Sequence, residues 1–298
     1  MRRLGLRIGL RVGDALARAL PRPAAYAVTD LLGRAWHRLA PDRRALVAAN
    51  LARVLRATGR PSTGPALRRA VRQAFVAHAR YYLEMLRAPH YPDDRLAEIV
   101  QVEDWERWQP VLRDGVVLVT GHLGNYEPFV HVLAAHGLRA VVPVEEIEPR
   151  ELFEFVLARR TSSPAVTVLP LSKAVRPMLT ALRKGEIAAL IADRDLVGDG
   201  QPVTLFGHPG TLPTGPAELA LRTGRPLLVV ACLRIGPERF RARAWLVEAP
   251  RGGTRAADVA ALTNALAGAL ETAIGLAPEQ WFAAFQSIWA DLPPGRAA

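Results

Sequence analysis

The sequence has very little cysteine, very little lysine and no long apolar run. Its one cysteine, Cys232, excludes both an intramolecular disulfide and a cysteine-based zinc site. Cys232 lies within an apolar stretch, so we expect it to be buried in a reducing, cytoplasmic compartment. No stretch offers about 18 consecutive apolar residues, so no transmembrane helix is predicted. The N-terminus also lacks the apolar core of a signal peptide.

Several common catalytic motifs are missing as well. The sequence contains no Gly-x-Ser-x-Gly for a serine nucleophile, no Gly-x-Gly-x-x-Gly or Gly-Lys-Ser/Thr phosphate loop, and no His-Glu-x-x-His. His122, His131 and His136 lie close together in the chain, but the last two should face different sides of a helix. We therefore predict no metal site.

The basic charge is concentrated in the first third of the chain. Residues 1–100 hold 19 arginines against 7 acidic residues, whereas residues 101–298 hold 20 basic and 21 acidic residues. The net charge of +11 is thus an N-terminal property. Such a surface indicates contact with phosphate, in membrane lipid or in nucleic acid.

Residues 2–20 predict a basic amphipathic helix. Apolar residues recur at helical spacing, and arginines lie off that stripe. One interpretation is a helix that lies in a membrane interface. The other is a helix that packs its stripe on the protein and leaves a solvated basic face. Both can hold in part.

The remaining pattern predicts an α/β fold with an all-helical N-terminal region. Further helices are expected over 24–39, 43–58 and 64–87, and prolines near residue 90 mark a boundary. Short apolar runs then alternate with helical segments, which is typical of a mostly parallel sheet flanked by helices. We expect a helical, membrane-associating region over 1–95 and an α/β domain over 96–298.

The stretch 121–127, GHLGNYE, is the first candidate site. It follows the apolar run 116–120, a predicted buried strand, and precedes the helical run 129–136. His122 and Glu127 therefore lie at the carboxyl end of a strand, where open α/β sheets bind ligands. They can face one substrate if His122 lies in the turn and Glu127 in the first helical turn. His122 would then accept a proton and a carboxylate would orient it; a solvated His and Glu is the ordinary alternative.

A second candidate cluster, Asp193-Arg194-Asp195, follows another predicted strand. Two acids around an arginine, directly after an apolar run, are poorly explained by solvation alone. Arg194 could bind a phosphate, and one aspartate could polarise the histidine. An ion pair at a loop entrance is the structural alternative.

The stretch GHLGNYE resembles the His-x4-Asp/Glu motif of glycerolipid and lipid A-type acyltransferases. Four further stretches are similar to the bacterial lipid A late acyltransferases and the actinobacterial phosphatidylinositol mannoside acyltransferases. They are NLARV at 50–54, EEIEP at 145–149, ADRDL at 192–196 with LFG at 205–207, and PEQWF at 278–282. The resemblance thus extends from near residue 50 to near residue 282.

The resemblance implies transfer of a fatty acyl group from acyl-CoA or acyl carrier protein to a hydroxyl of a membrane lipid. It implies that His122 is the general base. In the mannoside branch the acid at the position of Asp193 pairs with this histidine, and the motif acid, here Glu127, helps to hold the active-site loop. In other branches the motif acid itself pairs with the histidine as the charge-relay residue. Which acid orients His122 is therefore open.

The same resemblance places Glu145, Arg160, Arg194 and Asp195 in the substrate groove. No cofactor is expected, because a thioester is already activated and needs neither a metal nor a covalent intermediate. The oxyanion still needs donors, for which the backbone N–H groups of 121–125 or Arg194 are candidates.

The acceptor lipid stays open, because the mannoside branch usually has Asp at the motif's last position and Glu127 matches the lipid A type. We expect a peripheral enzyme on the cytoplasmic face of the plasma membrane, attached through residues 2–20. The alternatives are a lipid A-type enzyme with another glycolipid acceptor and a non-catalytic lipid-binding protein on the same fold. A nucleic-acid-binding protein would use the N-terminal arginines and give His122 no role; we expect no nucleic-acid partner.

Overall fold

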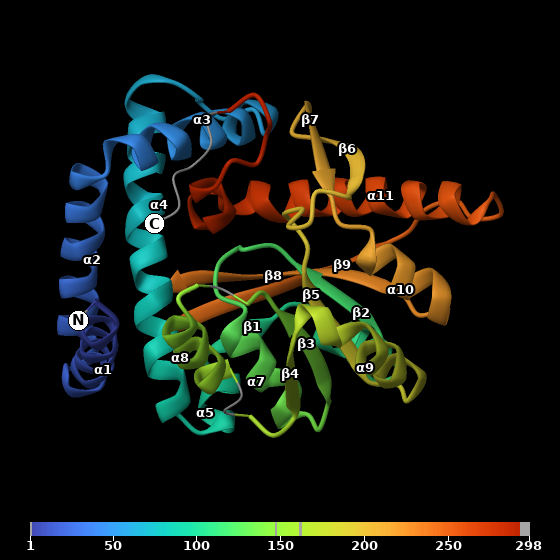
Figure 1. The fold of residues 1–298 in the computed structure, drawn as a ribbon, viewed down its shortest axis with the longest axis horizontal. Coiled ribbons are helices and arrows are strands. Elements are labelled where there is room, and N and C mark those ends of the chain that lie inside the picture. The colour runs from blue at the N-terminus through green and yellow to red at the C-terminus, as the bar shows by residue number, and fades with distance from the viewer. Residues whose placement is uncertain (1, 147, 161–162, 293–298) are drawn as a thin grey trace.

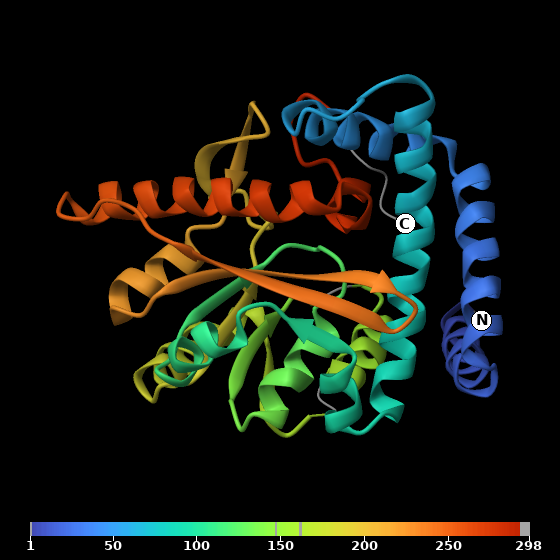
Figure 2. The same cartoon turned by 180° about the vertical axis from the view of Figure 1, so that it is seen from behind.

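The computed structural model describes residues 2–146, 148–160 and 163–292, and it confirms the predicted α/β class. Within these residues a seven-stranded sheet forms the centre, and helices cover both of its faces (Figure 1). The helical N-terminal region stands beside one end of the sheet, which Figure 2 shows from behind. The division of the chain into a helical region and an α/β domain at residue 95 stays a prediction.

The N-terminal helices form where apolar residues recur at helical spacing. They are α1 (Arg2–Ala19), α2 (Arg22–Leu39), α3 (Pro41–Ala57) and α4 (Gly64–Arg87), and each overlaps a predicted helix. Pro21 separates α1 from α2, since proline cannot continue a helix. The apolar spacing within 64–87 predicts Val71, Phe75 and Tyr82 on one inner face of α4. Val71 and Phe75 are buried, but the prediction is wrong for Tyr82, which is 48% exposed because it lines a cavity.

The sheet has the strand order β1-β9-β8-β2-β5-β3-β4. Its strands are β1 (Val100–Val102), β2 (Val117–Thr120), β3 (Ala140–Val144), β4 (Val166–Pro170), β5 (Ile187–Ile191), β8 (Leu227–Gly236) and β9 (Arg239–Val247). Neighbours run parallel except for β8 and β9, which are antiparallel. β2 and β5 lie side by side, so their carboxyl ends leave the sheet together. That edge is where parallel sheets place their ligands.

Helices pack on both faces because successive strand residues point to opposite sides. Val117 and Val119 join a core with α3, α4, α9, α10 and α11, whereas Leu118 joins a second core with α6 and α7. The remaining helices are α5 (Asp93–Glu98), α6 (Trp105–Arg113), α7 (Glu127–Ala135), α8 (Arg150–Arg160), α9 (Leu171–Arg183), α10 (Gly215–Thr223) and α11 (Arg255–Leu276). Short 3-10 turns complete the fold as η1 (Ala88–His90), η2 (Pro278–Gln280) and η3 (Phe282–Phe285).

Some elements were not predicted. β1 is too short to show an alternating pattern, and α6 contains Pro110, which interrupts its helical signal. β6 (Gln201–Leu205) and β7 (His208–Leu212) form a separate antiparallel hairpin. These elements lie beside the parallel core, whose strands and helices the sequence predicted.

The C-terminal part of the chain corrects one expectation. The helical spacing of Trp281, Phe285 and Trp289 predicts core residues on one helical stripe. They are buried in the core, but they lie on 3-10 turns and loops rather than on one helix. Among the described residues only α11 is long and apolar enough to cross a membrane. Its residues Leu266 and Leu270 are buried against the sheet, so we interpret α11 as a core helix.

Candidate active site

His122 and Asp193 meet because their strands are paired in register. Thr120 at the end of β2 lies beside Ile191 at the end of β5, and each of the two polar residues follows shortly after. His122 Nδ1 lies 2.7 Å from Asp193 Oδ1, and the backbone N–H of His122 donates to Asp193 Oδ2 at 2.8 Å. An ionised carboxylate only accepts hydrogen bonds, so Nδ1 carries the proton and Nε2 keeps its lone pair.

Asp193 is held as a buried carboxylate. It is 1% exposed, and the indole Nε1–H of Trp281 donates to its Oδ2 at 2.8 Å. Burial alone would raise the pKa of Asp193, but the charge of His122 and the hydrogen bonds from His122 and Trp281 lower it below its usual value. A fixed carboxylate beside an imidazole orients the ring and stabilises its protonated form. The pair can therefore act as an oriented base.

The loop that carries His122 is fixed along its length. The N–H of Gly124 donates to Gln280 O at 2.9 Å, and the N–H of Asn125 donates to Cys232 O at 2.8 Å. Gly124 has a φ of +63°, and a Cβ there would lie 2.1 Å from Cys232 O. Only glycine fits this position. The glycines at 121 and 124 of the sequence predict a sharply bent backbone around the histidine, and this is confirmed at Gly124.

His122 opens onto a cavity of about 440 Å³ at the carboxyl end of the strands. The His122 side chain is 30% exposed and lies among residues of α4, α8 and the loops after β3 and β5. Glu145, Arg194 and Asp195, which the resemblance assigned to a substrate groove, line the same cavity. Segments from distant parts of the chain therefore converge around His122.

The groove residues differ in what they contact. The Asp195 carboxylate accepts hydrogen bonds from the backbone N–H groups of its own loop, at 2.9 to 3.2 Å. Burial would raise the pKa of Asp195, but these backbone bonds lower it. Asp195 thus shapes the cavity wall. Arg194 has no hydrogen bond or ion pair with any described residue, so its guanidinium is available to a ligand. The side chain of Arg160 lies outside the described part of the structure.

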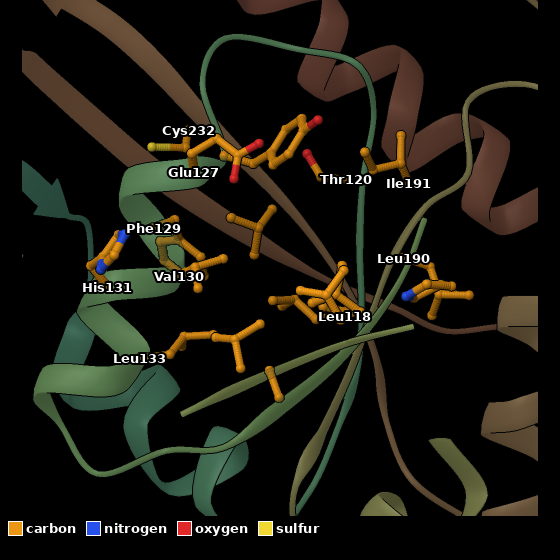
Figure 3. Close-up of a pocket in the computed structure, with 18 of the residues that line it drawn as sticks. Leu118, Thr120, Glu127, Phe129, Val130, His131, Leu133, Leu190, Ile191 and Cys232 are labelled. Carbon is orange, nitrogen blue, oxygen red and sulfur yellow. The ribbon is translucent and has the colours of Figure 1, made fainter. Parts of the chain in front are cut away.

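A second, apolar pocket of about 80 Å³ adjoins the cavity. Figure 3 shows its lining, with Phe129, Val130 and Leu133 of α7 facing Leu118 of β2. Tyr126, which directly precedes α7, and Ile191 of β5 line both the pocket and the cavity. The cavity that holds the base thus continues into an apolar space between α7 and the sheet.

Glu127 lies at this apolar pocket rather than on the ring of His122. As expected, His122 is in the turn and Glu127 begins α7. The Glu127 carboxylate accepts a hydrogen bond from Tyr81 at 3.5 Å, and its backbone N–H donates to Asn125 Oδ1 at 3.1 Å. Asp193 is the acid that bonds the His122 ring.

The comparisons with known proteins identify the family of this chain. Residues 5–289 match the family described as bacterial lipid A biosynthesis acyltransferase. A phosphatidylinositol mannoside acyltransferase of Mycobacterium tuberculosis (strain H37Rv) is 31% identical over 232 residues, covering 74% of this chain and 71% of the relative. One from Mycolicibacterium smegmatis is 32% identical over 237 residues, covering 76% and 75%. The chain belongs to this acyltransferase family.

The acyltransferase also has a buried ionic network behind its His122 loop. Glu84 of α4 accepts hydrogen bonds from the Arg234 guanidinium at 2.5 and 2.7 Å, from Tyr26 of α2 at 2.8 Å, and from Asn125 Nδ2 at 3.0 Å. Glu84, Arg234 and Asn125 are 5%, 8% and 0% exposed. The carboxylate thus ties two N-terminal helices and β8 to the loop.

Sequence reasoning missed the roles of several residues in this acyltransferase. Trp281 was interpreted only as core, although it stands within PEQWF, one of the stretches that carry the family resemblance. Glu84 and Arg234 had a local signal, a charge inside an apolar helix face and one at the end of an apolar strand. Their pairing across 150 positions of sequence was not visible.

Proposed function

We propose that this protein transfers a fatty acyl group from an acyl thioester to a hydroxyl of a membrane glycolipid, with His122 as general base. The observation that carries the proposal is the His122–Asp193 pair, with one ring nitrogen bound to a buried carboxylate and the other free to accept a proton. Membership of the family supports acyl transfer as the reaction class.

The chemistry needs only this base and an electrostatic site. The acceptor oxygen attacks the thioester carbonyl carbon while Nε2 of His122 takes the hydroxyl proton. The tetrahedral intermediate then collapses, the C–S bond breaks, and the thiolate takes the proton from His122 to leave as a thiol. The ester is formed, and His122 returns to its starting state. Asp193 stays ionised and stabilises the transient imidazolium.

The two spaces suit the two parts of an acyl donor. An alkyl chain entering the apolar pocket between α7 and the sheet removes about 0.8 kcal/mol of unfavourable hydration per buried CH₂. The larger cavity, with Arg194 and Glu145, then receives the acceptor and the donor's carrier group. Acyl-CoA and acyl carrier protein are the two donors to compare.

The helices α1 and α2 present the surface we propose for membrane contact. Val12 and Leu16 of α1 are 50% and 53% exposed, and Leu31, Leu32 and Leu39 of α2 are 61 to 82% exposed. Apolar side chains among numerous arginines match an interface with anionic lipid. Peripheral attachment to the cytoplasmic face of the plasma membrane is the corresponding location.

The acceptor we favour is a mannosylated phosphoinositide, because relatives named for that activity match about three quarters of this chain. A lipid A-type acceptor is the second candidate, since Glu127 is an acid of that type. Purified protein incubated with palmitoyl-CoA and each acceptor, followed by mass spectrometry of the lipids, separates the two.

The decisive variant is H122A. We expect it to lose both acyl transfer and thioester hydrolysis, by about a thousandfold or more, while its fold and its affinity for lipid vesicles remain. Full transfer by H122A would exclude this mechanism. Absence of turnover by the wild type with any thioester, together with retained lipid binding, would indicate a lipid-binding protein.

Membrane contact has its own test. Replacing Leu31 and Leu32 with serine should reduce co-sedimentation with anionic vesicles about tenfold or more, because roughly 1.5 to 3 kcal/mol is lost for each apolar side chain removed from the interface. V175S is the matched control, since Val175 is 54% exposed on α9. Unchanged co-sedimentation of the double variant would place the membrane surface elsewhere.

A further inference from the structure

The backbone N–H groups of residues 122–125 in the His122 loop are not available to an oxyanion. The N–H of His122 donates to Asp193 Oδ2 at 2.8 Å, and that of Leu123 donates to Gly121 O at 2.7 Å. The N–H groups of Gly124 and Asn125 are bound to Gln280 O and Cys232 O. Four of the five loop donors that were candidates from sequence are therefore already engaged. A side chain of the cavity is thus needed as a further donor for the charge that develops on the thioester oxygen.

His78 of α4 is a side chain of that cavity which the reaction scheme leaves unused. Its ring lies between the rings of Tyr82 and Phe282, at centroid distances of 5.1 and 4.6 Å and interplanar angles of 13° and 16°. The backbone N–H of Phe282 donates to His122 O at 2.6 Å. The residue that stacks on His78 is thus fixed to the backbone of His122.

The surroundings of His78 indicate which of its two ring nitrogens carries the proton. Its Nδ1 is shielded from solvent and has no hydrogen-bond partner among the described residues. A buried N–H without an acceptor is less tolerated than a buried lone pair without a donor, so the neutral ring carries its proton on Nε2. Burial, the charge of His122 and that of Arg43 lower the pKa of His78 to about 3. The ring therefore stays neutral when His122 takes a proton.

We infer that His78 is a further catalytic residue, whose Nε2–H donates a hydrogen bond to the carbonyl oxygen of the acyl thioester and to the oxyanion that forms from it. The inference rests on the proposed acyl transfer. Two histidines then divide the chemistry: His122 moves the proton and His78 polarises the carbonyl. A neutral imidazole is suited to this task because it donates without competing for the acceptor's proton.

Preorganisation favours His78 over Arg194 as this donor. The stacked ring of His78 cannot turn without separating from two aromatic partners, whereas Arg194 has several free torsions and no partner among the described residues. A donor that is fixed before the reaction stabilises the transition state without a reorganisation cost. We accordingly expect Arg194 to bind a substrate anion instead.

The test compares H78F with H78Q. Phenylalanine keeps the stack and removes the donor, so we expect kcat to fall about 10²- to 10³-fold while the melting temperature stays within the error of the wild type. Glutamine keeps an amide N–H and should recover part of the loss. Because the oxyanion forms in both reactions, acyl transfer and thioester hydrolysis should fall by the same factor, and the pH–rate profile should keep its shape.

F285L is the control for a loosened aromatic cluster. Phe285 packs edge-on against His78 at 4.6 Å, so its loss should lower the melting temperature and leave kcat unchanged. Full kcat in H78F would overturn the inference. So would a loss confined to transfer with hydrolysis intact, which would make His78 an acceptor contact. If H78F does not fold, equal kcat values for H78L and H78Q, neither of which can stack, would overturn it too. Failure of the proposed acyl transfer would give a different result from failure of this inference, because the wild type itself would then not turn over a thioester.

Discussion

The two ends of the His122 loop are held by different kinds of polar cluster. At the front, His122, Asp193 and Trp281 form a chain that ends in a ring nitrogen open to the cavity. At the back, Glu84 and Arg234 form an ion pair whose carboxylate oxygens all have donors. The front cluster keeps a reactive atom available to a substrate, and the back cluster keeps none. The front is thus suited to chemistry and the back to position.

This difference explains why the loop can be both reactive and rigid. Asn125 lies on the loop between the clusters, three residues after His122. Its amide donates to Glu84, and its Oδ1 accepts from the Glu127 N–H that starts α7. A shift of Glu84 would therefore pass to His122 through three residues of backbone. Placement errors of about 1 Å can cost about 100-fold in rate. A satisfied buried ion pair resists such a shift.

The largest expected effect comes from removing the charge at the front. D193N keeps the shape of the side chain but no longer offers two carboxylate oxygens to His122 and Trp281. We expect kcat to fall about 10³- to 10⁴-fold, measured as thioester turnover, with the fold retained by circular dichroism. E127Q is the matched control, because Glu127 bonds Tyr81 and begins α7. A larger loss in E127Q than in D193N would reverse the roles assigned to the two acids.

Substitutions in the back cluster should mainly change the stability of the fold. E84Q leaves the Arg234 guanidinium buried without a counter-charge, so the free energy of unfolding should fall by about 3–5 kcal/mol. In E84Q/R234M that charge is gone, and most of the stability should return. Urea unfolding of the two variants measures the difference.

The same double variant shows whether the back cluster serves position. The amide introduced by E84Q offers one acceptor oxygen where the carboxylate offers two, so Tyr26 and Asn125 would compete for it. We expect kcat to stay about tenfold below the wild type although the fold is restored, with KM unchanged. Wild-type kcat in the stable double variant would reduce the cluster to a stability element.

The sequence predicted the front of the site better than the back. His122 and Asp193 each follow a readable apolar strand, and parallel sheets bring such strand ends to one edge. Strand order is not encoded locally, so the adjacency of β2 and β5, which decides that Asp193 rather than Glu127 meets His122, needed the structure. Glu84 and His78 lay on a helix predicted correctly, but their burial depends on segments far along the chain.

The smallest predicted effect concerns acid stability and compares Asp193 with its asparagine variant. The pKa of folded Asp193 lies below that of an unfolded aspartate, since the opposing effect of burial is outweighed by His122 and Trp281. Its ionised form therefore stabilises the fold above the unfolded pKa, near 3.9, and this contribution is lost as pH falls through the folded pKa. The difference in unfolding free energy between wild type and D193N should be constant from about pH 6 to 5 and shrink in more acidic solution. A difference that grew on acidification would mean that Asp193 is protonated in the folded state, and the front cluster would then lack the charge on which its chemistry depends.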